Sequence, residues 1–288
     1  MPQKTLNLKR FFRHNSISNA LVLLPKQNKQ ESPQMQVQDT QNDAHSPEMT
    51  TMGKIKTIAR LIFKGDDEAR KAFIEYHLIR RKYVLSRTSE HFGKDKFEPA
   101  PLLGQRLLDV GCGTNRIAQE LTLRGADCTC IDPDADVLTH AEHDAQRYGA
   151  QISFIQTTVQ DLVHKSGQYD VILCLDLIGH CKDSQKAIWA MKKLLAPNGI
   201  IVFSAINNTW DSFFYHTIAA EFFLRWVPRG THRRRNFISP KKLSHMFRKE
   251  GLEVSQTVGV VFNPYRKDWF KTGDLSCRYM GVIKHKEL

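Results

Sequence analysis

An acidic residue and a histidine lie four positions apart in the segment LCLDLIGHC, residues 173–181. The segment begins as a continuous apolar run, which is typical of a strand in the middle of a parallel sheet. Asp176 and His180 follow that run, and a carboxylate with an imidazole can hold a metal ion or transfer a proton. The segment is therefore a metal site at the mouth of an active site, an altered form of such a site, or only the end of a strand.

A glycine-rich turn supplies a second possible site, in the segment LLDVGCGTNR, residues 107–116. An apolar strand runs into a turn that contains Gly111 and Gly113, and a helix follows. Because glycine has no side chain, a ligand can approach the backbone there and meet the free N–H groups at the start of the helix. Asp132 ends the next predicted strand, 23 positions after Asp109, where a carboxylate accepts hydrogen bonds from both hydroxyls of a ribose.

The same turn favours S-adenosylmethionine (SAM) over a dinucleotide. A dinucleotide fingerprint would place a glycine at position 116, where this chain has Arg116. An arginine there suits a smaller ligand without a pyrophosphate, and an acid inside the preceding strand, Asp109, is typical of SAM sites. The alternative is a tight turn that binds nothing, but the strand, the helix and the acid all agree with a cofactor site.

Apolar segments from residue 106 onward alternate between strand and helix patterns, which predicts a doubly wound α/β sheet. The predicted strands are 106–110, 128–132, 151–156, 169–176, 200–206, 252–262 and 275–283, and the predicted helices are 117–125, 136–149, 184–199 and 239–251. Ser239 is expected to cap the last helix. An aromatic helical segment near residues 209–236 interrupts the alternation and is interpreted as an insertion that covers the active site.

The chain of 288 residues divides into three predicted parts. Residues 1–53 form a tail whose first thirty residues contain Lys and Arg but no Asp or Glu, as a mitochondrial transit peptide requires; a basic tail on a bacterial protein is the alternative. Residues 54–96 show helical spacing of apolar residues and form a lead-in. Residues 97–288 form the α/β domain.

The formal net charge of +12 favours contact with anionic surfaces and says nothing about the fold. No apolar run is long enough for a membrane-spanning helix. The basic residues 233–235 follow an aromatic stretch, residues 213–226, and this combination suits a helix resting on anionic lipid better than one that contacts nucleic acid. A solvated loop beside an ordinary core helix is the alternative.

The segments LLDVGCG, CTCIDPD, YDVILCLD and APNG resemble those of the class I SAM-dependent methyltransferases. The later segment EFFLRWVPRGTHRRRNFISPKKL is more specific and resembles the ubiquinone-biosynthesis O-methyltransferases. The residues that carry this second resemblance are Trp226, Val227, Pro228, Thr231, His232, Phe237 and Pro240, with Ser204 and Asn207 after the fifth strand. The resemblance extends from about residue 106 to the C-terminus, with a looser fit over residues 76–84.

This resemblance implies a Rossmann-like doubly wound sheet, mostly parallel with an antiparallel last strand. It also implies methyl transfer from SAM to a phenolic oxygen on a polyprenylated ring. By resemblance, Gly111 would lie against the methionine part of SAM, Asp132 would hold the ribose, and Leu175 would contact the cofactor. An arginine of the lead-in helix would also contact SAM, and Arg80 is the best match, with Arg81 as the rival.

The expected partners follow from the same resemblance. They are a polyprenylated phenol, an anionic membrane surface and other quinone-biosynthesis proteins, whereas nucleic acid is not expected. The expected location is the matrix face of the inner mitochondrial membrane, or the cytoplasm if the chain is bacterial.

The family resembled here uses an E-x-x-E-H segment, with three side chains on one helical face, to hold a divalent cation. The matching positions in this chain are Asp176, Gly179 and His180, so the middle ligand has no side chain. Three hypotheses remain open. Magnesium is held by Asp176 and His180 with water and substrate, with Asp183 as a conceivable substitute ligand; or His180 acts as general base without metal; or the site is weak or inactive.

Other positions also depart from the family pattern. Asn115 stands where a glycine is usual after the Gly-x-Gly turn, and Arg233 stands where an acid normally follows Thr-His. The cofactor site is therefore better supported than the substrate site. The alternatives are a methyltransferase for another small phenol or for RNA, and a non-catalytic relative that binds SAM within a quinone-synthesis complex.

Overall fold

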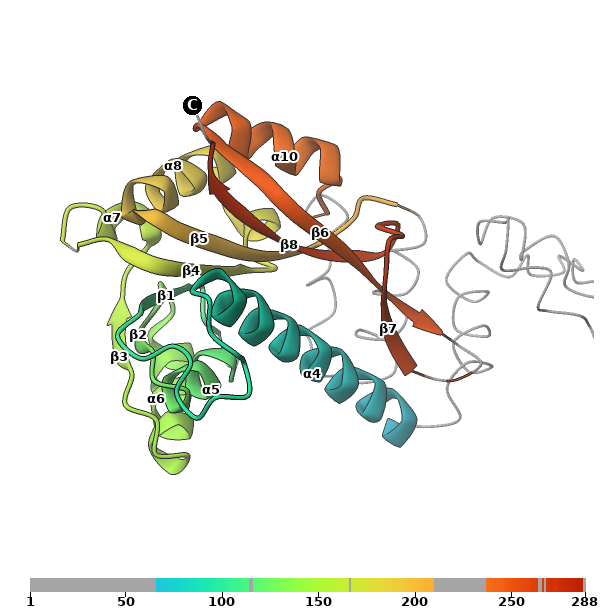
Figure 1. Cartoon of the computed structure of the whole chain (residues 1–288), viewed down its shortest axis with the longest axis horizontal. Helices are drawn as coiled ribbons and strands as arrows, with labels where there is room; N and C mark the ends of the chain where they lie inside the picture. The colour runs from blue at the N-terminus through green and yellow to red at the C-terminus, as the bar shows by residue number, and fades with distance from the viewer. Residues whose placement is uncertain are drawn as a thin grey trace, which may run out of the picture.

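The computed structural model describes residues 66–113, 116–165, 167–209, 237–263, 266 and 268–286. Within these residues a single eight-stranded sheet has the order β3-β2-β1-β4-β5-β8-β6-β7 (Figure 1). The strands are β1 (Arg106–Val110), β2 (Asp127–Asp132), β3 (Ser153–Gln156), β4 (Tyr169–Leu175), β5 (Leu195–Ile206), β6 (Leu252–Asn263), β7 (Asp268–Thr272) and β8 (Arg278–His285).

The strands β1 to β5 are parallel to one another, which confirms the predicted doubly wound sheet. The order reverses between β1 and β4, because β1 pairs with β2 on one side and with β4 on the other. Ligands of open α/β sheets bind outside the carboxyl ends of the strands at such a reversal. Asp109 and Leu173 are paired neighbours there, so the glycine turn and the Asp176 segment leave the sheet side by side.

Helices cover both faces of this sheet (Figure 1). Their bounds are α4 (Asp66–His91), α5 (Ile117–Leu123), α6 (Ala135–Arg147), α7 (Val159–Leu162), α8 (Ser184–Leu194) and α10 (Pro240–Lys249), with a single 3-10 turn η2 (Ile178–His180). Buried residues of α7, α8 and α10 belong to one apolar core and those of α4 and α5 to a second, while a smaller cluster joins α5 and α6 to β2. Ser239 caps α10 as predicted, because its hydroxyl accepts a hydrogen bond from the Lys242 N–H.

The antiparallel part of the sheet is larger than predicted. The strand β8 pairs antiparallel with β5, β6 pairs antiparallel with β8, and β7 was not predicted at all. Gly281 allows the close approach of β8 to β5, since a side-chain carbon at this position would lie 2.5 Å from the Phe203 ring. The C-terminal strand β8 is therefore inserted between β5 and β6.

The predicted helix over residues 184–199 was too long. The helix α8 ends at Leu194, and Leu195 already pairs with Tyr169 of β4. The pairing then shifts between Tyr169 and Val171, so the segment with Pro197 and Gly199 forms an irregular start of β5 rather than the end of a helix. Proline and glycine both disfavour helix, so the helix ends before them and the chain continues as a strand.

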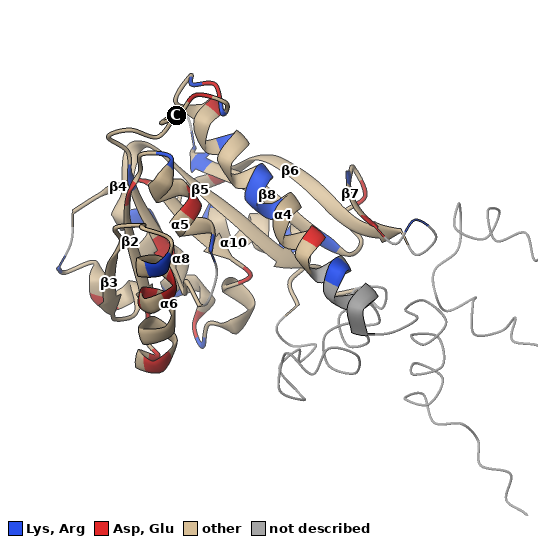
Figure 2. Cartoon of the chain, turned by 90° about the horizontal axis from the view of Figure 1, so that it is seen from below, with Lys and Arg blue, Asp and Glu red and all other residues tan. Residues whose placement is uncertain are grey.

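Three earlier predictions lie partly or wholly outside the described residues. These are the basic tail over residues 1–53, the first part of the lead-in, and nearly all of the insertion near residues 209–236. The proposed division at residues 53 and 96 stays a prediction. No helix among the described residues has the length and apolar character needed to cross a membrane. Figure 2 shows that Lys and Arg recur along α4.

Candidate functional site

The glycine turn after β1 adopts a backbone that side chains disfavour. Gly111 and Gly113 have φ values of +65° and +55°, in the left-handed region that favours glycine. The Gly111 N–H donates to the Ile131 carbonyl at 2.8 Å, which ties the turn to β2. A side-chain carbon on Gly111 would lie 2.7 Å from Leu177 Cδ1, so the turn also packs against the segment that follows β4.

Asp132 lies beside this turn, as the spacing predicted. Its Oδ2 accepts a hydrogen bond from the Gly113 N–H at 3.3 Å, and its Oδ1 accepts one from the Asp134 N–H at 3.0 Å. The parallel pairing of β1 with β2 produces this proximity, because both strands end at the same edge. The carboxylate is thus held in place next to the turn, and its predicted contact with a ribose stays a prediction.

Asp109 is buried below the turn, with 1% of its surface exposed. Its Oδ2 has no hydrogen-bond partner among the described residues. Burial raises the pKa of this carboxyl to about 7, with Arg80 opposing the shift and Asp132 adding to it. A buried oxygen without a partner beside a glycine turn suits a ligand that carries hydrogen-bond donors.

The raised pKa of Asp109 predicts a pH-dependent stability. Because the folded pKa of about 7 exceeds the ordinary value of 3.8, the native state holds the proton more tightly than the unfolded chain. This contribution is complete below pH 3.8 and is lost as the pH rises to about 7, which amounts to about 4 kcal/mol. The variant Asp109→Asn stays neutral and should not show this loss.

Urea unfolding of the protein without cofactor, at about pH 4.5 and pH 8, measures this difference. Wild type should lose stability relative to Asp109→Asn as the pH rises. Parallel stability curves for the two proteins would contradict the assignment of the raised pKa to Asp109.

A cavity of about 590 Å³ joins the turn to the end of β4. Its walls come from α4, the glycine turn, the start of α5, the end of β4 and the start of β8. The lining residues that matter for binding are His77, Arg80, Arg81, Gly111, Gly113, Arg116, Asp176 and Arg278. This volume lies within the range of small-molecule sites. The open backbone at Gly111 and the buried Asp109 oxygen beneath it fit SAM at this end of the cavity.

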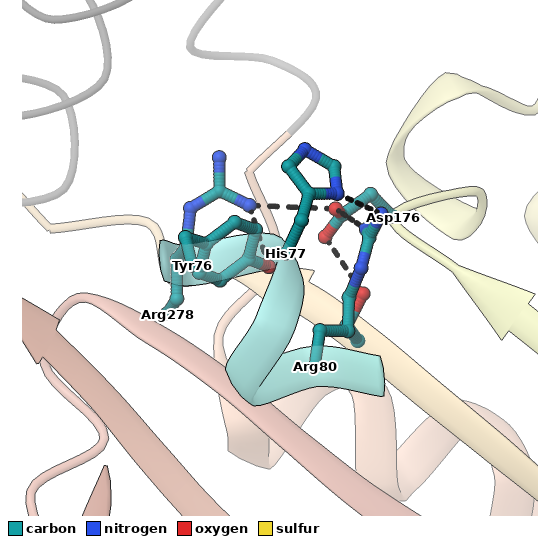
Figure 3. A network of polar contacts seen from close by, with 6 residues as sticks. Tyr76, His77, Arg80, Asp176 and Arg278 are labelled. Carbon is teal, nitrogen blue, oxygen red and sulfur yellow. Dashed lines mark hydrogen bonds and ion pairs between the residues drawn. The ribbon is translucent and has the colours of Figure 1, made fainter. Parts of the chain in front are cut away.

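At the other end of the cavity, Asp176 is held by two arginines (Figure 3). Its Oδ2 accepts from Arg80 Nη1 at 2.8 Å and from Arg278 Nη1 at 3.3 Å, and its Oδ1 accepts from the Ser204 hydroxyl at 3.0 Å. Burial alone would raise the pKa of Asp176, but Arg278 and then Arg80, together with the Ser204 hydroxyl, lower it below its usual value. The carboxylate is therefore ionised.

The backbone of Asp176 is as unusual as its side-chain contacts. Its φ of +57° lies in the left-handed region, and among the described residues no other non-glycine residue has such a value. Its N–H donates to the Ser204 carbonyl at 2.9 Å, so β5 fixes the strained residue at the end of β4. Strain of this kind costs about 1–3 kcal/mol and concentrates at functional sites.

Two of the residues in this network, Tyr76 and Arg278, were missed by sequence reasoning. Arg278 Nη1 also donates to the Tyr76 hydroxyl at 2.9 Å, and its guanidinium carbon lies 4.3 Å from the Tyr76 ring centroid. A third missed residue, His77, lies against Arg80, whose Nη2 is 3.1 Å from its Nδ1. The helical spacing of Tyr76, His77 and Arg80 was visible in the sequence, but nothing there placed Arg278 beside them.

Arg80 and Arg81 have different partners, although both line the cavity. Arg80 is 5% exposed and is paired with Asp176, whereas Arg81 forms an ion pair with Glu120 of α5 at 2.5 Å. Leu175, predicted to contact the cofactor, also lines the cavity at the end of β4. The direct contact of Arg80 or Leu175 with SAM stays a prediction.

The predicted metal ligands Asp176 and His180 do not lie on one helical face, because Asp176 precedes η2 in a left-handed conformation. His180 is exposed and is not among the described residues that line the cavity. Asp183 caps α8 by accepting from the Lys186 N–H at 3.0 Å.

The residues present do not fit a divalent cation at Asp176. Among the described residues, no group of three His, Cys, Asp or Glu side chains is placed to hold one. Both oxygens of Asp176 are already engaged, and two guanidinium groups contact one of them. Guanidinium groups this close to the carboxylate also repel any divalent ion that approaches it.

Comparison with known proteins places the chain in a family. Residues 76–257 match the methyltransferase-domain family. A ubiquinone biosynthesis O-methyltransferase from Azorhizobium caulinodans is 34% identical over 206 residues, which are 72% of this chain and 81% of that protein. One from Dinoroseobacter shibae is 33% identical over 203 residues, which are 70% of this chain and 82% of that protein.

Solved structures show the same fold at low sequence identity. The magnesium protoporphyrin IX methyltransferase from Synechocystis with bound SAH has a TM-score of 0.52 and 16% identity, over 85% of this chain and 89% of that one. A SAM-dependent methyltransferase from Clostridium acetobutylicum has a TM-score of 0.51 and 14% identity, over 76% of this chain and 98% of that one. The chain therefore belongs to the class I SAM-dependent methyltransferases, in the family of the ubiquinone-biosynthesis O-methyltransferases.

Proposed function

We propose that this methyltransferase transfers a methyl group from SAM to a phenolic or catechol oxygen on the ring of a polyprenylated ubiquinone precursor. The observation that carries the proposal is the single cavity that joins the Gly111 turn to the charged cluster at Asp176. The relatives named ubiquinone biosynthesis O-methyltransferase support the substrate class.

Different residues along the cavity would bind SAM and position the acceptor ring. Gly111 and Gly113 leave the backbone open to SAM, and Asp132 would accept hydrogen bonds from its ribose. When bound, SAM supplies a methyl group on a sulfonium. The acceptor oxygen must lie in line with that methyl group, and the buried walls at Leu175 and Arg80 restrict where a ring can sit.

Magnesium is not part of this proposal. The phenol becomes a better nucleophile as its proton leaves, and a divalent cation is one means of favouring that loss. Asp176 is occupied by arginines and His180 lies outside the cavity lining, so the donor set that the family pattern suggested does not serve here.

We also propose a peripheral contact with an anionic membrane, where a substrate with an isoprenoid tail would be found. The support is the formal charge of +12 and the basic residues that follow the aromatic stretch at residues 213–226. The proposed location is the matrix face of the inner mitochondrial membrane, or the cytoplasm in a bacterium, and other quinone-biosynthesis proteins are proposed partners. Sedimentation with anionic but not with neutral vesicles would support the membrane contact.

Methyl transfer from labelled SAM to a short-tailed catechol analogue of the ubiquinone ring tests the activity. We expect a labelled methyl ether as product. SAH binding is measured in parallel by calorimetry. If SAH binds but neither this catechol nor a panel of small phenols is methylated, the proposed activity is wrong, and a SAM-binding relative without catalysis remains.

A further inference from the structure

The helices α8 and α10 carry basic residues and no acidic ones. They lie side by side on one face of the sheet, because their buried residues share one apolar core and Gln185 Nε2 donates to the Met246 carbonyl at 3.1 Å (Figure 1). Their outer sides therefore form one continuous surface, here called the basic face. Its charged residues are Lys186, Lys192, Lys193, Lys241, Lys242, Arg248 and Lys249.

The basic face concentrates the charge of the chain. Its three α8 lysines and four α10 residues carry +7, whereas the formal net charge of the whole chain is +12. Two acids lie at its margins: Asp183 caps α8 and lies 3.6 Å from Lys186 Nζ, and Glu250 follows α10 and accepts from Gln185 Nε2 at 2.6 Å. Among the residues that the structure describes, no other member of the basic face has an ion-pair partner. The face thus keeps an excess of positive charge.

Helix stability explains only part of this arrangement. Cations in the last turn of a helix are favourable, because the final carbonyls carry a partial negative charge, and both helices have basic residues there. Lys241 and Lys242 instead lie in the first turn of α10, directly after Pro240, where a cation opposes the helix dipole. Both lysines are exposed. An ordinary solvated surface intersperses charges of both signs, so this surface is better suited to an anionic partner.

An exposed tryptophan lies within the basic face. Trp189 is 39% exposed, and the helical spacing places it between Lys186 and Lys193 on the outer side of α8. Lys193 Nζ lies 6.0 Å from the centroid of its ring. Tryptophan is enriched where a membrane meets water, because its ring is apolar and its N–H is polar. Cations around such a ring are what a peripheral contact with anionic lipid requires.

The basic face reaches the edge of the sheet that carries the cavity. The helix α8 follows η2, which leaves the carboxyl end of β4. The Ile238 N–H, just before α10, donates to the Ile206 carbonyl at the end of β5 at 2.9 Å. Among the described residues that line the cavity, none belongs to either helix. A bilayer against this face would lie beside the site, and substitutions in the face should leave the chemistry intact.

We propose that the basic face, with Trp189 at the level of the lipid headgroups, is a surface by which this methyltransferase binds anionic phospholipid. This surface deepens the membrane contact proposed above, and the choice of lipid rests on the proposed function, because a polyprenylated substrate is found in a bilayer. Lysine and arginine N–H groups donate to the lipid phosphates. The contact lies outside the aromatic stretch at residues 213–226 and does not depend on it.

Sedimentation of the full chain with vesicles tests this surface. One set of vesicles contains equal parts of phosphatidylglycerol and phosphatidylcholine, and the other contains phosphatidylcholine alone. We expect wild type to bind only the anionic vesicles. In the double variant Lys241→Glu with Lys242→Glu, binding should weaken by at least about 30-fold, because each basic residue near an anionic surface contributes about fivefold.

The double variant separates a loss of binding from a loss of fold. Glutamate in the first turn of α10 complements the helix dipole, so the melting temperature should stay the same or rise. The matched control is Lys94→Glu with Lys96→Glu, which changes the net charge equally at exposed residues of the loop after α4. That loop begins at Phe92, which packs against the other core, and the control should keep vesicle binding within about threefold.

A second measurement needs no change of charge. Phospholipids with brominated acyl chains quench the fluorescence of a tryptophan that enters the bilayer. Wild type bound to anionic vesicles should be quenched, and Trp189→Phe should lose a large part of this quenching. Equal quenching of the two proteins would place Trp189 outside the bilayer and contradict the assigned surface.

Other outcomes would also overturn this surface. Anionic vesicles might be bound equally by wild type and the double variant, or not bound by wild type at all. Binding of a labelled single-stranded RNA by wild type, lost in the double variant and without vesicle binding by either, would assign the face to nucleic acid. Methyl transfer to the short-tailed catechol analogue without vesicles should be equal in wild type and the double variant. No methyl transfer by a protein that binds vesicles as expected would overturn the proposed function and leave the lipid surface intact.

Discussion

The variant Asp176→Asn is expected to lose about 3 kcal/mol of unfolding free energy and most of the methyltransferase activity. Asparagine keeps the shape and one acceptor, but it leaves the guanidiniums of Arg80 and Arg278, 6% and 12% exposed, without their carboxylate. Two buried like charges then repel each other, and neither arginine stays in place. Urea unfolding at pH 7 measures the loss of stability, and methyl transfer to the catechol analogue measures the loss of activity.

This stability difference has a defined pH dependence. The folded pKa of Asp176 lies below its ordinary value of 3.8, so its contribution is present above pH 3.8 and is lost as the pH falls through the folded value. The gap between wild type and Asp176→Asn should therefore be constant from about pH 5 to pH 8 and should shrink in stronger acid.

Asp183→Asn is the matched control for this variant. Asp183 is an N-cap with a side chain 47% exposed, and asparagine caps helices about as well as aspartate. It should leave both stability and activity near wild type. Equal stability of wild type and Asp176→Asn would mean that the two arginines do not depend on this carboxylate.

The variant Gly111→Ala is expected to weaken SAH binding by about 100-fold, or about 2.7 kcal/mol. Alanine pays a conformational cost at φ +65°, and its methyl carbon would lie 2.7 Å from Leu177 Cδ1. The turn must then shift away from β2, where the Gly111 N–H is bonded to Ile131, and the added carbon also occupies space that the cofactor needs. Calorimetry with SAH measures the loss.

Gly149→Ala separates the backbone cost from the effect on the site. Gly149 has φ +70°, and a side-chain carbon there would meet no atom within 4 Å. It lies after α6, away from the cavity lining, so its substitution should lower stability by about 1 kcal/mol and leave SAH affinity unchanged. If Gly111→Ala bound SAH as well as Gly149→Ala does, the turn would not be the cofactor site.

The backbone between Asp176 and His180 could not be predicted from the spacing of these residues. The positions Asp176, Gly179 and His180 were matched to a family segment whose three side chains share one helical face, with Gly179 as the missing ligand. The chain instead turns sharply at Asp176, with φ +57°, and only the three-residue turn η2 follows. A spacing of four residues brings side chains together only if the backbone between them is helical.

The sequence by itself determined the strand, turn and helix around Gly111, the acid at Asp132 and the mostly parallel, doubly wound character of the sheet. These features are local, because a strand, a glycine turn and a helix each depend on contiguous residues. Apolar side chains recur with a period of 2 in a strand and 3.6 in a helix. The position of Asp132 follows as well, since parallel neighbours end at the same edge of the sheet.

Only the tertiary structure decided what stands opposite Asp176. Arg80 and Arg278 are 96 and 102 positions away from it in sequence, on a helix and on a strand that approach the site from different directions. Periodicity shows which face of an element is buried, but it does not show which buried side chains meet. The insertion of β8 between β5 and β6 brings Arg278 to the carboxyl end of β5, and that pairing places a second guanidinium beside Asp176.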